Sequence, residues 1–175
     1  MQSSIYLVGF MGSGKSHVGR QLSRYLRLPF VDLDAEIVAH YGGSINTIFS
    51  AKGEAYFRLL ERFVLHQTEL RPPAIIATGG GTPCFFDNIH WMNKRGTCIF
   101  LDPSIEILTE RLRQGRHKRP LIKQLSDHQL QLYISNKLSE RRPFYEQAAA
   151  HFRINKAEED VAGMLYRQLN YIIGH

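Results

Sequence analysis

Gly9-Phe10-Met11-Gly12-Ser13-Gly14-Lys15-Ser16 matches the pattern G-x-x-x-x-G-K-[ST] at every position. An apolar run precedes this stretch at residues 5–8, and a segment of helical character follows at residues 15–26. That is the strand, loop and helix context that the motif requires. Glycines let the loop direct backbone N–H groups toward phosphate oxygens at the positive end of the helix. The stretch therefore predicts a nucleotide phosphate site, in which Lys15 reaches the β- and γ-phosphates and the Ser16 hydroxyl ligates Mg²⁺.

The composition is that of one globular domain, residues 1–175, with 43% apolar and 22% charged residues. Its two cysteines, Cys84 and Cys98, lack the spacing of metal ligands, so we expect a reducing compartment. The first apolar run has no basic segment before it and ends in the phosphate loop, which is not typical of a secretory signal. No stretch reaches the length of a bilayer span. We therefore expect a cytoplasmic protein with no membrane partner.

The net charge of +6 is local rather than spread along the chain. Residues 111–142 contain nine Lys and Arg residues against Asp127 and Glu140, so this segment alone carries more positive charge than the whole chain. In a protein with a phosphate loop, a local cationic cluster is explained by polyphosphate and an anionic substrate. We therefore expect no nucleic-acid partner.

Strands and helices alternate along the chain. Five apolar runs predict strands at residues 5–8, 28–34, 74–78, 97–101 and 151–154. Helical segments are expected at residues 15–26, 44–50, 54–70, 87–94, 103–113, 127–141 and 158–172. Pro103 is expected at the first position of its helix, where proline is favoured. This alternation predicts a three-layer α/β/α fold with a five-stranded parallel sheet covered on both faces.

Polar and glycine-rich residues follow the first three predicted strands. They are the phosphate loop, the acids Asp32 and Asp34, and the glycine run 79–81. Ligands of such a sheet bind outside the carboxyl ends of its strands, so these features are expected at one crevice. In an extended chain Asp34 points to the same side as Asp32. The alternative for this pair is a solvated turn, or Asp34 as the N-cap of the following helix.

The order and approximate spacing of several motifs resemble those of shikimate kinases over essentially the whole chain. The motifs are Gly9 to Ser16, Asp32-Leu33-Asp34, Gly53-Glu54 followed by Phe57-Arg58-Leu59-Leu60-Glu61, Thr78-Gly79-Gly80-Gly81, Arg119-Pro120-Leu121 and Arg141-Arg142-Pro143-Phe144-Tyr145. The resemblance implies a P-loop fold like that of nucleoside monophosphate kinases, with a helical substrate-binding segment at about 33–61 and a mobile lid at about 113–124. It also implies transfer of the ATP γ-phosphoryl group to the 3-hydroxyl of shikimate, giving shikimate 3-phosphate and ADP in the pathway to chorismate and aromatic amino acids.

The resemblance assigns the substrate half of the site. Asp34 would accept hydrogen bonds from substrate hydroxyls and orient or deprotonate the attacking one. Arg58 and Arg141 would bind the shikimate carboxylate, because the planar guanidinium suits a planar anion, and Glu61 would hold Arg58. The other residues expected to contact shikimate are Phe49, Phe57, Gly79, Gly80 and Gly81. Arg142 is interpreted as a solvated neighbour.

The ATP half combines the phosphate loop with more distant residues. Asp32 is a candidate partner of the Mg²⁺ held by Ser16, because the strand at 74–78 ends without an acidic residue. Arg119 matches the lid arginine that meets the transferring phosphate, which places it with Lys15 and Asp34 among the catalytic candidates. The residues expected to contact ATP are Gly12, Ser13, Gly14, Lys15, Ser16, His17, Arg113, Arg119 and Asn155, with Arg113 and Asn155 near the adenine.

His17 departs from the family, whose members usually carry Ser or Thr at this position. Its imidazole could donate a hydrogen bond to a phosphate oxygen or point away from it.

Two other functions are compatible with parts of this pattern. A related kinase acting on a small hydroxylated acid such as gluconate would share the phosphate loop but would not require Asp34, Arg58, Gly80 and Arg141 together. A nucleotide-dependent RNA-binding or regulatory protein would explain the basic charge, but it predicts aromatic residues interleaved with Lys and Arg. The basic segment 111–123 contains no aromatic residue. ATP, ADP and shikimate are the expected partners of a protein that acts as a monomer.

Overall fold

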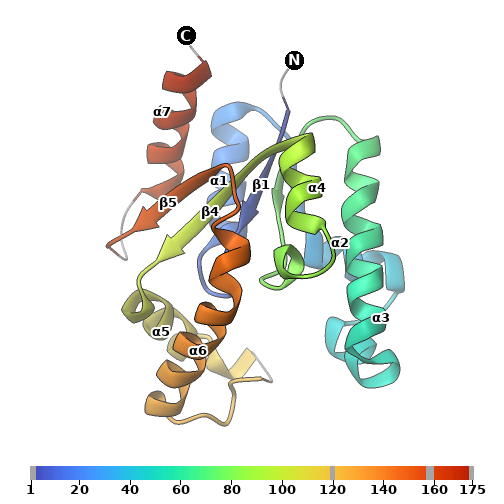
Figure 1. Ribbon diagram of the computed structural model, residues 1–175, viewed down its shortest axis with the longest axis vertical. Coiled ribbons are helices and arrows are strands. Elements are labelled where there is room, and N and C mark those ends of the chain that lie inside the picture. The colour runs from blue at the N-terminus through green and yellow to red at the C-terminus, as the bar shows by residue number, and fades with distance from the viewer. Residues whose placement is uncertain (1–2, 119–120, 157–159, 174–175) are drawn as a thin grey trace.

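The computed structural model describes residues 3–118, 121–156 and 160–173. Its centre is a five-stranded sheet in the order β2-β3-β1-β4-β5, with every neighbouring pair parallel (Figure 1). The strands are β1 Ser4–Val8, β2 Phe30–Asp32, β3 Ile75–Ala77, β4 Gly96–Pro103 and β5 Ala150–Ile154. The predicted five-stranded parallel sheet is therefore confirmed.

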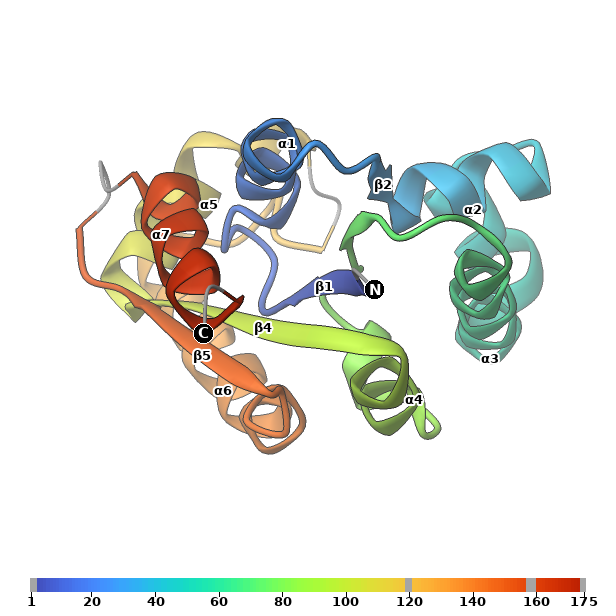
Figure 2. The same cartoon turned by 90° about the horizontal axis from the view of Figure 1, so that it is seen from above.

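Helices cover both faces of this sheet and complete the three layers. They are α1 Lys15–Leu26, α2 Leu33–Tyr41, α3 Ile45–Gln67, α4 Asn88–Arg95, α5 Ile105–Gln114, α6 Asp127–Tyr145 and α7 Val161–Ile173. Short 3₁₀ turns are η1 Thr68–Leu70, η2 Thr82–Cys84 and η3 Arg116–Lys118. Seen from above, α1 and α7 lie on one side of the sheet and α4 and α6 on the other (Figure 2).

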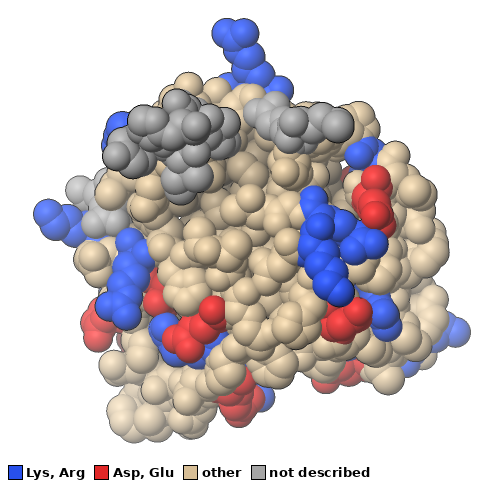
Figure 3. All heavy atoms as spheres, turned by 45° about the horizontal axis from the view of Figure 1, so that its top comes forward, with Lys and Arg blue, Asp and Glu red and all other residues tan. Residues whose placement is uncertain are grey.

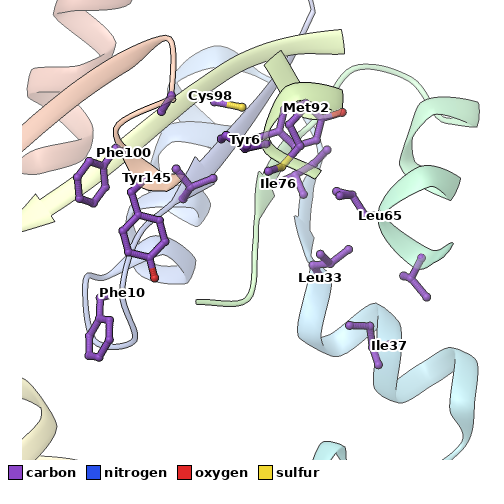
Figure 4. Close-up of a cluster of buried hydrophobic side chains, with 14 of the residues drawn as sticks. Tyr6, Phe10, Leu33, Ile37, Leu65, Ile76, Met92, Cys98, Phe100 and Tyr145 are labelled. Atoms are coloured by element: carbon purple, nitrogen blue, oxygen red, sulfur yellow. The ribbon is translucent and has the colours of Figure 1, made fainter. Parts of the chain in front are cut away.

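The alternation of side chains along β1 divides the core into two clusters. Ile5 and Leu7 pack with α1 and α7, whereas Tyr6 and Val8 face the cluster under α3, α4 and α6. Successive side chains of a strand point to opposite faces, so a strand buried on both sides is apolar throughout. Figure 4 shows the second cluster, in which Tyr145 of α6 lies close to Phe100 of β4. This packing holds α6 against the sheet, near the strand ends that are followed by the loops expected to bind ligands.

The chain turns into helix earlier after β2 than the apolar run predicts. Asp32 is the N-cap of α2, and its Oδ1 accepts a hydrogen bond of 3.4 Å from the Ala35 N–H. Asp34 consequently lies in the first turn of α2, so the expectation that it continues an extended chain is wrong. The strand ends here because the Asp32 side chain accepts a hydrogen bond from a helix N–H that would otherwise be unpaired.

Two further boundaries differ from the sequence prediction because tertiary contacts override local preference. β4 continues through Pro103, which pairs with Ile154, and Ser104 caps α5. Pro103 is therefore a strand residue and not the first residue of a helix. α6 continues past Pro143 to Tyr145, since burial of Tyr145 offsets the cost of a proline inside a helix.

The two predicted helices at 44–50 and 54–70 are joined in the structure across a kink. Gly53 lies at the kink with φ 80° and ψ 174°, values outside the helical range. Positive φ is the region that favours glycine. The predicted break is thus present as a bend within α3.

Membrane proteins are marked by long apolar helices, and nucleic-acid-binding proteins by clustered basic side chains. In the described part of the chain, no helix has both the length and the apolar character of a membrane span. On the face drawn in Figure 3, Lys and Arg side chains form separate small groups, several of them beside acidic side chains. The described residues of this face leave wide uncharged areas between those groups.

Candidate active site

A cavity of about 430 Å³ lies at the carboxyl ends of the strands. Its walls come from the phosphate loop, the start of α1, the β2–α2 junction, the loop after β3 and helix α5. The charged and polar side chains that line it include Lys15, Ser16, His17, Asp32, Asp34 and Arg111. Segments that are more than sixty residues apart in sequence thus share one crevice, as parallel strands require.

The phosphate loop has the backbone geometry of an anion cradle. Gly14 caps α1 in the left-handed region, with φ 95° and ψ 13°. At Gly9, φ is 140°, and a Cβ there would lie 2.6 Å from the Leu101 carbonyl oxygen. Lys15 is buried, and its Nζ donates to the carbonyls of Gly9 at 2.7 Å and Phe10 at 2.9 Å. The loop therefore holds an ammonium group beside the positive N-terminus of a helix.

Ser16 and Asp32 place a hydroxyl and a carboxylate side by side at the edge of this loop. Ser16 Oγ donates to Asp32 Oδ2 at 2.7 Å, and both residues line the cavity. A hydroxyl and a carboxylate are hard donors of the kind that Mg²⁺ prefers, and Mg²⁺ usually adds waters and phosphate oxygens to one or two such groups. The residues present therefore fit a magnesium site.

Asp34 lies next to this pair and carries an altered proton affinity. Its pKa is raised from 3.8 to about 6, first by desolvation and then by the negative charges of Glu61 and Asp32, against the opposing effect of Lys15 and Arg58. The side chain remains open to the cavity, which it lines. A carboxylate with such a pKa is ionised at neutral pH and more basic than an ordinary aspartate.

Arg58 is held by two glutamates of its own helix. Its Nη1 donates to Glu61 Oε2 at 2.8 Å, while Nε and Nη2 donate to Glu54 Oε1 at 3.2 and 3.1 Å. Both Arg58 and Glu61 are buried. These bonds use three of the five guanidinium N–H groups and leave one N–H on each Nη. That remaining pair can bind one carboxylate.

Aromatic rings enclose the same guanidinium. Its Cζ lies 4.1 Å from the ring centroid of Phe85 and 5.0 Å from that of Phe57. Phe49, half exposed on the first part of α3, stacks at a tilt on Phe57 with centroids 4.6 Å apart. The rings restrict Arg58 and add favourable cation–π contacts.

The glycine run after β3 lies beside Arg58 and Arg141, which are not among the residues that line the cavity. A Cβ at Gly80 would lie 3.6 Å from Nη1 of Arg141, and one at Gly81 only 2.7 Å from both Nη atoms of Arg58. Tyr145, one helical turn beyond Arg141, donates its hydroxyl to the Gly80 carbonyl. Both arginines therefore meet the same short backbone segment.

The neighbouring Arg142 has a different role from the one expected. It forms a two-pronged ion pair with Asp102, with Nη2–Oδ1 at 2.8 Å and Nη1–Oδ2 at 3.0 Å. This pair attaches α6 to the end of β4, so Arg142 is a structural anchor and not merely a solvated neighbour.

Not every residue expected at the site lies in the cavity. Arg113 is exposed and pairs with Glu110 at 2.6 Å and Asp127 at 3.7 Å, beside a separate cavity between α5 and α6. Asn155 borders a third cavity, near Asp102. Arg119 lies outside the described residues, and His17 lines the main cavity with an exposed side chain.

Sequence reasoning missed Arg111, Thr82 and Tyr145. Arg111 Nη1 lies 3.4 Å from the Gly12 carbonyl oxygen and 3.3 Å from that of Ser13. Arg111 follows one buried residue of α5 by three positions and another by four. Residues at these spacings share one face of a helix, so periodicity would have placed Arg111 on the inward face of α5. Thr82 and Tyr145 gave no such signal, because threonine and tyrosine are common in ordinary cores.

Comparison with known proteins identifies a family for this architecture. The family model described as shikimate kinase matches residues 11–170. A shikimate kinase of Parabacteroides distasonis is 42% identical over 159 residues, covering 90% of this chain and 92% of that protein. The shikimate kinase of Aquifex aeolicus is 42% identical over 157 residues, covering 90% of each.

Solved structures agree with these relatives. The crystal structure of a shikimate kinase from Bacteroides thetaiotaomicron has a TM-score of 0.91 at 35% identity, covering 99% of each chain. A shikimate kinase from Acinetobacter baumannii in complex with shikimate has a TM-score of 0.87 at 31% identity, covering 99% of this chain and 94% of that one.

Proposed function

The chain belongs to the shikimate kinase family, and we propose that it transfers the γ-phosphoryl group of ATP to the 3-hydroxyl of shikimate. The products are ADP and shikimate 3-phosphate, on the pathway to chorismate and the aromatic amino acids. The observation that carries this function is the place of Asp34, which lines the cavity of the phosphate loop and interacts electrostatically with both Lys15 and Arg58. A carboxylate there can hold an acceptor hydroxyl against a bound polyphosphate.

In the ATP half, the loop residues Gly12 to Ser16 surround the phosphates with backbone N–H groups. The Lys15 ammonium, which donates to loop carbonyls in this structure, would donate to β- and γ-phosphate oxygens instead. Ser16 and Asp32 would hold Mg²⁺, which when bound neutralises charge on the β- and γ-phosphates. Arg111, beside the loop carbonyls, and Arg119 of the lid would add positive charge around the transferring group.

In the shikimate half, Arg58 and Arg141 bind the carboxylate and the run Gly79 to Gly81 allows the ring to approach the backbone. Phe49 and Phe57 line one side of the ring. Asp34 orients the 3-hydroxyl and accepts its proton as the oxygen attacks phosphorus. Its raised pKa favours this role, because a stronger base takes the proton more readily while remaining ionised at neutral pH.

Several broader features belong to the same proposal. Residues 1–175 act as one domain, in which about 33–61 bind substrate and about 113–124 form the lid. The protein works as a monomer in the cytoplasm with no membrane or nucleic-acid partner. The free thiols of Cys84 and Cys98 support a reducing compartment. Retention of RNA at moderate salt, or a dimer by light scattering, would contradict these points.

The function is tested with a panel of acceptors. Purified protein with Mg²⁺-ATP should release ADP when shikimate is added and remain near background with gluconate or nucleoside monophosphates. A Lys15→Ala preparation is the control, since activity that persists in it comes from a contaminating kinase. If the wild-type protein releases ADP with gluconate and not with shikimate, the assignment is wrong.

A further inference from the structure

Thr82 occupies a buried position near Arg58, the arginine proposed to bind the substrate carboxylate. It is the first residue of η2, directly after the glycine run, and its side chain is fully buried. Its hydroxyl donates to Glu61 Oε1 at 2.6 Å. The other oxygen of the same carboxylate accepts from Arg58 at 2.8 Å. A continuous chain of hydrogen bonds therefore runs from Thr82 through Glu61 to Arg58.

A buried carboxylate needs partners for both oxygens. Glu61 is only 1% exposed, so water cannot replace a lost donor readily. Arg58 satisfies Oε2, but Oε1 points into the space around Gly79. An alanine Cβ at Gly79 would lie 2.8 Å from Glu61 Oε1, 3.0 Å from Asp34 Oδ1 and 3.0 Å from Thr82 Oγ1. Two carboxylates thus converge beside Gly79, and the Thr82 hydroxyl donates its proton to one of them, that of Glu61.

This arrangement determines which way Glu61 faces. If Oε1 lost its donor, the buried carboxylate would rotate toward another partner or become protonated, because an unsatisfied buried charge is costly. Either change disturbs the bond to Arg58 Nη1. The guanidinium would then turn about its remaining bonds to Glu54, and the two N–H groups proposed to bind the substrate carboxylate would be misaligned.

The Thr82 backbone is anchored independently of its hydroxyl. Its N–H donates to the Gly79 carbonyl at 3.2 Å, and its carbonyl accepts from Asn88 Nδ2 at 2.9 Å. A change confined to the side chain should therefore leave the η2 turn in place. This makes the hydroxyl separable from the fold.

We propose that Thr82 is a positioning residue for substrate binding: its hydroxyl orients Glu61, and Glu61 orients Arg58 toward the carboxylate of the acceptor. The inference rests on the proposed function for the identity of the acceptor. The hydrogen-bond chain itself does not depend on that identity.

The test compares Thr82→Val, which keeps the shape and removes the hydroxyl, with Thr82→Ser, which keeps the hydroxyl and removes a methyl group. Thr82→Val should raise the KM for shikimate about tenfold, the effect of losing one hydrogen bond to a buried charge, and leave the KM for ATP within about twofold. Thr82→Ser should restore a KM close to that of the wild type. The control is Thr68→Val, since Thr68 is also buried and its hydroxyl donates to the Leu65 carbonyl at the far end of α3.

Crystal structures of the two Thr82 variants give a readout that does not depend on turnover. Glu61 and Arg58 should keep their contact in Thr82→Ser and separate in Thr82→Val. Wild-type positions of both side chains in Thr82→Val would overturn the inference, as would equal KM changes in the two variants. If Thr82→Val cannot be purified, Thr82→Ala is compared with Thr82→Ser in the same way. An inactive wild-type protein would overturn the proposed function alone, because the structures still decide the role of Thr82.

Discussion

Ser16 at the start of α1 and Asp32 at the end of β2 are joined by a hydrogen bond of 2.7 Å between Ser16 Oγ and Asp32 Oδ2. β3 lies between β1 and β2 in the sheet, so the two residues meet only through the packing of α1. The bond brings a hydroxyl and a carboxylate to one point of the cavity, where the proposed magnesium site lies. Asp32 also caps α2 through its other oxygen.

Replacing Asp32 should separate its two roles. Asp32→Asn keeps an oxygen that can cap α2 but loses the charge, so the Mg²⁺ concentration for half-maximal activity should rise about 10- to 100-fold. Asp32→Ala should show the same loss and in addition lower the free energy of unfolding by about 1 kcal/mol, the usual effect of a lost N-cap. Magnesium titrations of activity and urea unfolding measure the two effects. An unchanged magnesium requirement in Asp32→Asn would remove Asp32 from the metal site.

The pH dependence of catalysis should report Asp34. Since its pKa is about 6, kcat/KM for shikimate should fall as the pH drops below about 6, where the carboxylate becomes protonated and can no longer accept a proton. Asp34→Asn should lower kcat about 10²- to 10⁴-fold, the usual contribution of a general base. Full activity of wild-type protein at pH 4.5 would contradict this assignment.

Asp34 should also make the stability of the protein depend on pH. Activity should fall at low pH, whereas stability should fall at high pH. The folded protein binds the Asp34 proton more tightly than the unfolded chain, because the folded-state pKa lies above the ordinary value of 3.8. The contribution of Asp34 to the free energy of unfolding therefore decreases as the pH rises from about 4 to about 6. Asp34→Asn should be more stable than the wild type at pH 8, and the difference should shrink as the pH falls through about 6. Urea unfolding at several pH values tests this, and a variant less stable at pH 8 would refute it.

A methyl group at position 81 should disturb the carboxylate site. The added Cβ of Gly81→Ala would lie 2.7 Å from both Nη atoms of Arg58, and the rings beside Arg58 leave it little room to move. We expect kcat/KM for shikimate to fall about 10- to 100-fold, as when a binding group is displaced by about 1 Å. Gly43→Ala is the control, because the atoms nearest its added Cβ would be those of the Tyr41 ring at 3.3 and 3.4 Å and Thr47 Cβ at 3.9 Å, away from Arg58. Equal shikimate kinetics in both variants would contradict the proposed role of Arg58.

Two arginines of α5 should differ in their effect on ATP. Arg111→Gln should raise the KM for ATP about tenfold, because it removes a charge that lies beside the phosphate loop. Arg113→Gln should change this KM less than about twofold, since Arg113 forms exposed ion pairs, which are weak. Steady-state kinetics at saturating shikimate compare the two. A larger increase in the KM for ATP in Arg113→Gln than in Arg111→Gln would support the expected place of Arg113 near the adenine.

Much of the fold could be predicted because it follows from local pattern. The five parallel strands are marked by short apolar runs, and the two-sided burial of β1 is visible in four consecutive apolar residues. Boundaries were less predictable where a distant contact competes with local preference. Pro103 remains in a strand because its backbone pairs with β5, and Pro143 remains in a helix because Tyr145, the last residue of that helix, is buried.

Sequence alone was sufficient to identify the phosphate loop of this protein, because its ligands are backbone groups of consecutive residues and glycine positions reveal their conformation. The order of its motifs was also sufficient to indicate the family. The tertiary structure was needed for interactions between segments that meet only after folding: the bond from Ser16 to Asp32, the inward face of Arg111 and the chain from Thr82 to Arg58. Their geometry depends on how helices pack on the sheet, and single residues such as threonine carry no pattern that reveals it.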